Sequence, residues 1–363
     1  MPLSSPFATP FTTPNRTEHP SSSTTPTEAL PPTTGAWQTC RVVEVLRNRV
    51  QVHDGQTTRS ASVSHALQRE LADASDALAV GDWVQVDAQD CVQQRLPPRN
   101  QLSRRLNDGR DKNERLVIVS NVDTAFLVMG LDADFNLRRL DRYIALVRMA
   151  GVQPVVVLTK ADRVGDVSRK TDEARAALPA DVPCVSLNGL DAETSRALLR
   201  PWLPPGHTAV LLGSSGAGKS TLTHALCDHS TQGTGPTRDG DGRGRHTTTV
   251  RTLLPCVGGA SIIDTPGLRS LRLDADERGL ARAFADVAQL ASGCRFRNCQ
   301  HAGEPGCAVA DSLSPERLNS WHKLQREAQR DTMTALERQR QLSEWKQRSQ
   351  AGRQRLKDKR QAG

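Results

Sequence analysis

The sequence predicts a multidomain chain in which a small β-barrel precedes a central α/β domain and a short helical region follows it. Three observations predict this order. Short alternating strands separated by turn signals fill residues 37–99, which favours a barrel of the OB-fold type. Buried apolar runs alternate with helical patterns over residues 102–273, as in a parallel sheet. Three cysteines and a histidine cluster inside the third region, residues 274–335.

Composition limits the class of protein. The chain has 363 residues, enough for two or three domains, and a formal net charge of +8. We find no apolar run near eighteen residues and no signal peptide, so we expect a cytoplasmic monomer without membrane contact. The eight cysteines do not form a disulfide framework. Aromatic residues make up 3%, so base stacking is not a major mode of nucleic-acid contact.

The two ends differ in composition from the rest. Residues 1–36 are rich in Ser, Thr and Pro and are expected to be a disordered tail, to which we assign no function. From Ser314 onward there are thirteen Lys and Arg against six Asp and Glu, and residues 336–363 read as a basic helix or tail. That stretch is either a surface for RNA or a solvated helical face. Apart from Trp345, this stretch has no apolar stripe of the kind that a membrane-bound helix would bury.

A phosphate-binding loop is the strongest motif. An apolar run over residues 209–212 predicts a strand before it, and residues 221–226 predict a helix after it, which is the context this loop requires. Its glycines let successive N–H groups surround a phosphate, while Lys219 reaches the β- and γ-phosphates and Ser220 binds Mg²⁺. A Gly/Ser-rich turn that matches by chance is the alternative. The loop comprises Gly213, Ser214, Ser215, Gly216, Ala217, Gly218, Lys219, Ser220 and Thr221.

A second motif follows the predicted strand over residues 155–158. Thr159, Lys160, Ala161 and Asp162 resemble the guanine-specificity motif N-K-x-D of GTPases, with Thr in place of Asn. Asp162 would accept hydrogen bonds from guanine N1–H and its amine, which adenine cannot supply. The Thr removes an amide that contacts the base and braces the phosphate loop, so affinity is expected to suffer more than base choice. Taken alone, the tetrapeptide is equally a helix N-cap after a strand.

Three further segments complete a nucleotide site. A strand over residues 261–263 ends in Asp264-Thr265-Pro266-Gly267, a D-x-x-G pattern that places Asp264 near Mg²⁺ and the Gly267 N–H near the γ-phosphate. The Gly-rich segment 242–249 holds Thr248 between two other threonines, and one of the three can complete the Mg²⁺ shell. Residues 184–187 are interpreted as a loop over the guanine ring, with Ser186 as its contact.

The order of these motifs is unusual. In ordinary GTPases the phosphate loop comes first and N-K-x-D comes late. Here the guanine motif and the Ser186 segment precede the phosphate loop, the threonines and D-x-x-G. The central domain, residues 102–273, therefore resembles a circularly permuted GTPase. In that order, movement at Gly267 on loss of the γ-phosphate could pull on the C-terminal region.

The cysteine–histidine cluster has the composition of a closed structural zinc site. Cys294, Cys299, His301 and Cys307 lie within fourteen residues that also contain Gly and Pro. Reduced structural thiols or a disulfide are the alternatives, but neither explains the histidine, and disulfides are rare in cytosolic chains. Four protein ligands leave no open position, so the zinc is expected to be structural.

Taken together, the barrel, the permuted nucleotide domain and the C-x₄-C-x-H-x₅-C cluster resemble the bacterial ribosome small-subunit-dependent GTPases of the RsgA family, over residues 37–330. The resemblance implies a GTPase with GTP, Mg²⁺ and one zinc. It implies that the barrel binds rRNA near the decoding region, that hydrolysis is faster on the small subunit than alone, and that the protein leaves after hydrolysis in late subunit maturation. On fold alone, a barrel without RNA binding stays open.

The catalytic water lacks an obvious partner. Small GTPases place Gln after D-x-x-G to orient this water, but residue 268 is Leu. His246, beside the threonines, is the nearest polar candidate, and it could equally contact only RNA or solvent. Two rival functions also stay open: a phosphate-loop ATPase away from the ribosome, and an RNA-binding checkpoint in which hydrolysis only times release. A large-subunit role fits the domain order less well.

Overall fold

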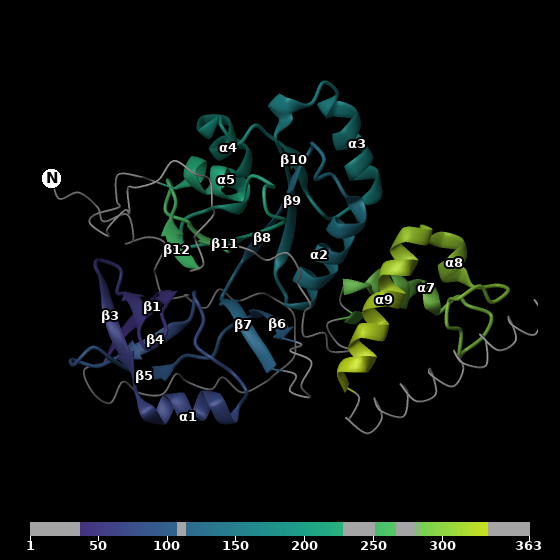
Figure 1. Ribbon diagram of the computed structural model, residues 1–363. Helices are drawn as coiled ribbons and strands as arrows, with labels where there is room; N and C mark the ends of the chain where they lie inside the picture. Colours follow the sequence, from purple (N-terminus) through teal and green to yellow (C-terminus); the bar gives the residue numbers. More distant parts are fainter. Residues whose placement is uncertain (1–36, 107–113, 228–250, 266–279, 282, 333–363) are drawn as a thin grey trace, which may run out of the picture. The chain divides into compact units, whose positions relative to one another are not determined.

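The computed structural model describes residues 37–106, 114–227, 251–265, 280–281 and 283–332 (Figure 1). They form two compact units. The first contains the barrel and the α/β elements, and the second contains the helices around the cysteine–histidine cluster. The tails 1–36 and 336–363, the segment with His246 and Thr248, and Gly267 with Leu268 lie outside the described residues.

The barrel has the predicted OB-type architecture. Its strands pair as β1 with β2 and β4, β2 with β3, β3 with β5, and β5 with β4, and one helix lies between β3 and β4. Alternating Val residues point inward and form a buried core with Leu67 and Leu71 from that helix. The elements are β1 (Gln38–Val45), β2 (Val50–His53), β3 (Thr58–Val63), α1 (His65–Asp73), β4 (Trp83–Val86) and β5 (Cys91–Arg95).

A pair of strands not anticipated from the sequence, β6 (Gln101–Leu106) and β7 (Glu114–Ser120), forms a separate two-stranded sheet. The chain then enters the α/β layer. Its strands are β8 (Thr124–Gly130), β9 (Gln153–Thr159), β10 (Cys184–Ser186), β11 (Thr208–Leu212), β12 (Thr252–Pro255) and β13 (Ser261–Asp264).

The strand order in this layer is β10-β9-β8-β11-β13-β12. All neighbours are parallel except β12, which runs antiparallel to β13. Chain order runs outward from β8 toward β10, then restarts at β11 on the other side of β8. In such doubly wound sheets ligands bind where the order reverses, outside the carboxyl ends of the strands. The reversal here lies between β8 and β11.

Helices cover both faces of the layer. Figure 1 shows α2 and α3 on one side of the strands and α4 and α5 on the other. Phe126, Leu211 and Ile262 from the strands pack with Leu222 and Leu226 of α5 in one buried core. The helical segments are α2 (Leu137–Met149), η1 (Ala161–Arg163), α3 (Val167–Ala177), α4 (Ala192–Leu199), η2 (Arg200–Trp202) and α5 (Lys219–Leu226).

The barrel and the α/β layer share one continuous sheet. Strand β1 pairs with β12 at Glu44 and Thr252. Nearby, the buried Arg41 lies over the Trp83 ring and donates hydrogen bonds to the Asn121 carbonyl at 3.1 Å and the Thr208 hydroxyl at 3.3 Å. Because Thr208 begins β11, this buried cation joins the barrel to the strand that leads into the phosphate loop.

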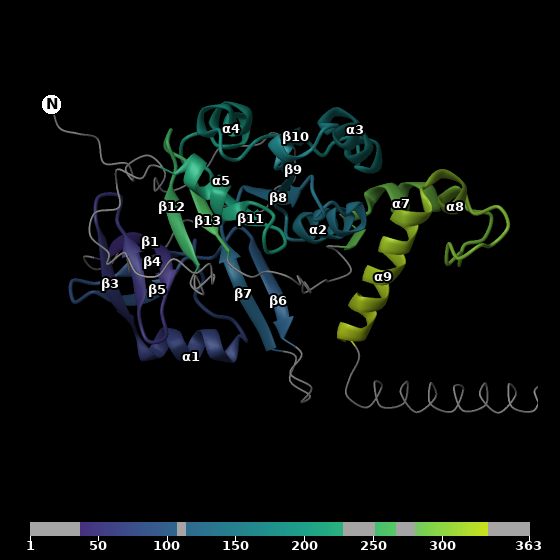
Figure 2. The ribbon, with the colours of Figure 1, turned by 45° about the horizontal axis from the view of Figure 1, so that its top comes forward.

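The second unit is helical. It contains α7 (Ala285–Ala291), α8 (Ala308–Ser312) and α9 (Pro315–Thr332) (Figure 2). Arg317 of α9 binds Asp286 of α7 at 2.9 Å and lies over the Phe284 ring at 4.4 Å, which fixes the two helices together. Within the described part of the chain, no helix is both long and apolar enough to span a membrane.

Candidate active site and metal centre

The phosphate loop lies between β11 and α5, as predicted. Gly213 lies so close to β8 that a Cβ there would be 2.2 Å from the Val128 carbonyl oxygen, so this position requires glycine. Gly216 and Gly218 have φ of +79° and +95°, the left-handed region that favours glycine. No described side chain caps the start of α5. Its first N–H groups therefore remain available to an anion, which the helix dipole also attracts.

Lys219 and Asp264 are two of the charged groups at this end of the sheet. The Lys219 Nζ donates to the carbonyls of Gly213 at 2.9 Å and Ser214 at 2.7 Å, so it lies over the loop. Burial lowers the pKa of the Lys219 ammonium. Burial also raises the pKa of the Asp264 carboxyl at the end of β13. In both cases burial destabilises the charged form of the side chain. A bound ligand of opposite sign would stabilise that form, a phosphate for Lys219 and a cation for Asp264.

The donor set also fits Mg²⁺. Ser220 is exposed in the first turn of α5, and α5 packs against β13, whose last residue is Asp264. A hydroxyl and a carboxylate oxygen are the hard ligands that Mg²⁺ prefers beside phosphates. Gly267, Thr248 and His246 were predicted for the same site and lie outside the described residues.

The guanine motif lies one strand beyond the reversal point. Thr159 is the last residue of β9, Lys160 has a left-handed φ of 61°, and Ala161 and Asp162 begin a 3₁₀ turn. The Asp162 side chain is about one third exposed, which leaves its carboxylate accessible to a base. The segment therefore does not form the N-cap of an ordinary α-helix, which was the alternative interpretation.

We expected that Thr in place of Asn at position 159 would remove the contact that braces the phosphate loop, and this expectation is wrong. The Thr159 hydroxyl donates to the Ala217 carbonyl of the phosphate loop at 2.5 Å. A Cβ on Gly218 would lie 3.1 Å from the same hydroxyl oxygen, so the two segments are in close contact. The shorter hydroxyl reaches the phosphate loop because β9 and β11 both border β8 and end at the same edge.

The expectation for Ser186 needs a second correction. Cys184, Val185 and Ser186 form strand β10 and not a loop, since they pair in register with residues 156–158 of β9. The β-branched valine and the adjacent buried strand favour pairing. The loop begins at Leu187, whose N–H donates to the Leu158 carbonyl at 2.9 Å. Gly189 in this loop lies beside Thr221 of α5, so the loop does reach the phosphate-loop helix.

Sequence reasoning missed the turn after β8. Asp132 accepts a hydrogen bond from the Lys160 Nζ at 2.6 Å, and Asp134 accepts one from the Ser214 hydroxyl at 2.6 Å. One turn therefore touches both the guanine motif and the phosphate loop. A usable signal existed: residues 125–129 are an apolar run typical of a buried strand, and residues that follow a parallel strand lie at the ligand-binding edge.

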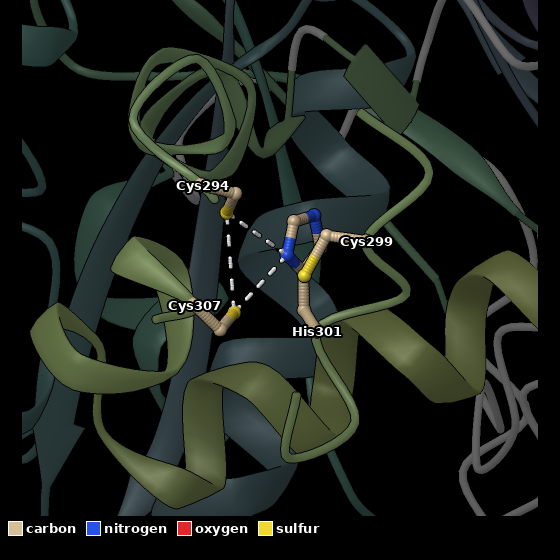
Figure 3. A group of neighbouring side chains, drawn as sticks. All are labelled: Cys294, Cys299, His301 and Cys307. Carbon is tan, nitrogen blue, oxygen red and sulfur yellow. Dashed lines mark hydrogen bonds between the residues drawn. The ribbon is translucent and has the colours of Figure 1, made fainter. Parts of the chain in front are cut away.

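The four predicted metal ligands converge (Figure 3). The His301 Nδ1 lies 3.6 Å from the Cys294 Sγ and 3.4 Å from the Cys307 Sγ, and those two sulfurs are 4.0 Å apart. The ligand atoms of all four residues, Cys299 included, lie within 4.8 Å of one another. Tetrahedral zinc with Zn–S of about 2.3 Å and Zn–N of about 2.0 Å places its ligand atoms about 3.5–3.8 Å apart. The cluster can hold such an ion.

Local structure explains the convergence. Cys294 follows α7, Cys307 is the N-cap of α8, and the chain between them turns through Gly303 and Gly306, both with positive φ. His301 also has a positive φ of 57°. Helix α9 holds His301 in place. The His301 carbonyl lies 3.0 Å from the His322 Nε2, and the His301 ring lies 5.3 Å from the Trp321 ring.

Comparison with known proteins identifies the family. A model of the RsgA GTPase domain matches residues 95–274. The protein named small ribosomal subunit biogenesis GTPase RsgA from Xylella fastidiosa (strain 9a5c) is 42% identical over 313 residues, covering 82% of the chain and 90% of that relative. The protein of the same name from Xanthomonas axonopodis pv. citri (strain 306) is 43% identical over 320 residues, covering 82% and 85%.

Solved structures agree on the fold. YjeQ from Thermotoga maritima aligns with a TM-score of 0.60 at 23% identity, over 80% of the chain and 98% of that structure. YloQ, described as a circularly permuted GTPase, aligns with a TM-score of 0.56 at 23% identity, over 84% of the chain and all of that structure. The predicted fold class is thus confirmed: barrel, permuted nucleotide domain and a cluster that could bind zinc. By sequence and by fold, the chain belongs to the RsgA family of GTPases.

Proposed function

We propose that this GTPase acts in the late maturation of the small ribosomal subunit, binding rRNA in its GTP state and leaving after hydrolysis. The observation that carries the proposal is the extended identity, above 40% over four fifths of the chain, to relatives named for small-subunit biogenesis. The convergence of the phosphate loop, the guanine motif and Asp264 at one sheet edge supports the nucleotide half of it.

Within the site, the residues take the following proposed roles. Lys219 and the phosphate-loop N–H groups bind the β- and γ-phosphates. Ser220, Asp264 and one threonine of 247–249 hold Mg²⁺, and the Gly267 N–H senses the γ-phosphate. Asp162 selects guanine, the loop that follows Ser186 lies over the base, and His246 orients the water once the subunit has ordered its segment.

The other parts have proposed roles as well. The barrel, residues 37–99, contacts rRNA, and the helical region, residues 274–335, is stabilised by one structural zinc held by its Cys₃His cluster. Continuity of β1 with β12 and the Arg41 hydrogen bonds offer a path between the nucleotide layer and the barrel. Because the partner is the ribosomal subunit, we place the protein in the cytoplasm, and we take it to act as a monomer.

Nucleotide-dependent co-sedimentation tests this function. The purified protein is incubated with small subunits and a non-hydrolysable GTP analogue, GDP, or an ATP analogue, and large subunits serve as control. We expect pelleting with small subunits and the GTP analogue, and much less with GDP. Equal pelleting in every nucleotide state would contradict a nucleotide-gated role. Pelleting in none of the nucleotide states would contradict the ribosomal role and leave the alternative of a phosphate-loop ATPase away from the ribosome.

A further inference from the structure

The turn after β8, residues 131–135, is here called the acidic turn. It lies at the reversal of strand order, because β8 borders both β9 and β11 in the sheet. Its Asp132 carboxylate binds Lys160 of the guanine motif, and its Asp134 carboxylate binds Ser214 of the phosphate loop, each at 2.6 Å. The acidic turn therefore connects the two halves of the nucleotide site.

The Asp132–Lys160 pair is tightly constrained by the backbone. A Cβ on Gly130 would lie 2.5 Å from Asp132 Oδ1 and 3.3 Å from Lys160 Nζ, so a larger residue there would displace the ends of these two side chains. The Leu131 N–H donates to the Thr159 carbonyl at 3.0 Å, which fixes the acidic turn against the end of β9. The hydrogen bond from Lys160 is the main reason that the pKa of Asp132 is lowered, so this group is a carboxylate at neutral pH.

Asp134 is held equally firmly. Its Oδ1 accepts from Ser214 and binds Arg139 at 2.6 Å, and its Oδ2 accepts from the Gly130 N–H at 3.1 Å. The Asp134 N–H in turn donates to Asp132 Oδ1 at 3.2 Å. The two carboxylates are thus linked to each other, and each is paired with a cation. That pairing matters because an unpaired carboxylate beside a triphosphate would repel it.

We propose that Asp132 and Asp134 are positioning residues for guanine-nucleotide binding: Asp132 holds Lys160 at the base subsite, and Asp134 holds Ser214 at the phosphate subsite. The inference rests on the nucleotide site proposed above. It also explains how the site stays connected with Thr at position 159, because the acidic turn supplies a second link between base and phosphate motifs beside the Thr159–Ala217 hydrogen bond.

The direction in which one substitution changes nucleotide affinity distinguishes a positioning role of Asp132 from a purely electrostatic one. If Asp132 only adds negative charge near the phosphates, Asp132→Asn strengthens nucleotide binding. If Asp132 positions Lys160, the same substitution weakens it. Fluorescent GDP affinity is measured for the wild type, Asp132→Asn and Asp132→Glu, with thermal unfolding of each. Asp181→Asn is the matched control, since Asp181 pairs with Arg148 at 2.5 Å on the surface after α3.

We expect Asp132→Asn to weaken GDP binding about tenfold at an unchanged unfolding temperature, with recovery in Asp132→Glu. The Asp132–Lys160 ion pair is partly exposed and is therefore screened by salt, so the difference in GDP affinity between Asp132→Asn and wild type should become smaller at about 1 M salt. Unchanged or tighter binding by Asp132→Asn overturns the role of Asp132. A folded wild type that binds no GDP overturns the nucleotide site itself, which is a different result.

A double-mutant cycle tests Asp134. Ser214→Ala, Asp134→Ala and the double variant are compared for GDP affinity. Because the two side chains act through one hydrogen bond, the double variant should lose no more affinity than Asp134→Ala alone. Additive losses would show that Asp134 does not act through Ser214. Should Asp134→Ala fail to fold, Ser214→Ala against wild type decides the question: Ser214→Ala should bind GDP several-fold more weakly, and an affinity equal to that of wild type would overturn the assignment.

Discussion

The Thr159 hydroxyl donates a hydrogen bond to the Ala217 carbonyl at 2.5 Å, joining the guanine motif to the phosphate loop. Both groups are buried at the carboxyl edge of the sheet. The oxygen of a hydroxyl, one bond from Cβ, reaches the loop because Gly218 brings its backbone against Thr159. The site thus keeps a brace between base and phosphate subsites without the usual Asn.

Replacing this hydroxyl should weaken nucleotide binding. Thr159→Val keeps the shape of the side chain but leaves the buried Ala217 carbonyl without that donor, at a cost of about 1 kcal/mol. We expect GDP affinity to fall about fivefold, while Thr159→Ser stays near wild type. Thr194→Val, which removes an exposed hydroxyl on α4, is the control. Equal affinity in Thr159→Val and wild type, by fluorescent GDP titration, would contradict the brace.

Base choice should depend on Asp162. Asp162→Asn replaces a double acceptor with an amide that can donate, so guanine loses its partners and xanthine gains one. We expect GDP affinity to fall by at least tenfold and xanthosine diphosphate affinity to rise. Competition of each nucleotide against fluorescent GDP or its xanthine counterpart measures both. If the order of base preference does not change, Asp162 does not read the base.

The sequence predicted the site wherever a motif coincides with the end of a parallel strand. Lys219, Asp162 and Asp264 are such cases. The Cys₃His cluster lies between helices and could be predicted for another reason, because all four ligands fall within fourteen residues of the sequence. The acidic turn could not be found in this way. Asp132 and Asp134 acquire meaning only from partners 28 and 80 residues away, which tertiary pairing of β8 with β9 and β11 brings together. The extent of β10 was missed because three residues carry little periodicity.

Metal should stabilise the second unit alone. We expect about one zinc per chain, and Cys294→Ser should lose it together with the fold of the helices around it. GDP binding should remain, because the nucleotide residues belong to the other unit. Cys91→Ser, in barrel strand β5, is the control and should keep the metal. Full zinc content in Cys294→Ser, by atomic emission, would remove this residue from the ligand set.

Asp82 should give the barrel a distinctive pH dependence. Burial raises the pKa of this carboxyl from 3.8 to about 6, so the folded state binds a proton that the unfolded state has released between these values. The contribution of Asp82 to the free energy of unfolding is therefore greatest below pH 3.8 and is lost as the pH rises through 6. A difference of about two units between the pKa of the folded and the unfolded state corresponds to about 3 kcal/mol in the free energy of unfolding.

Asp82→Asn isolates this contribution, because Asn cannot titrate but can still accept from the Ala79 N–H. Urea unfolding is followed between pH 4 and 7 in both proteins. We expect the stability of wild type, relative to the variant, to fall over this range and to level off above about pH 6.5. A constant difference between the two proteins would show that Asp82 keeps its ordinary pKa in the folded state.

GTP hydrolysis tests the proposed function most directly, measured for the purified protein alone, with small ribosomal subunits, and with large subunits. We expect slow turnover by the protein alone, because Leu268 cannot orient the water, and strong stimulation by small subunits only. Stimulation by neither subunit would contradict the ribosomal role and leave a GTPase whose activator lies elsewhere.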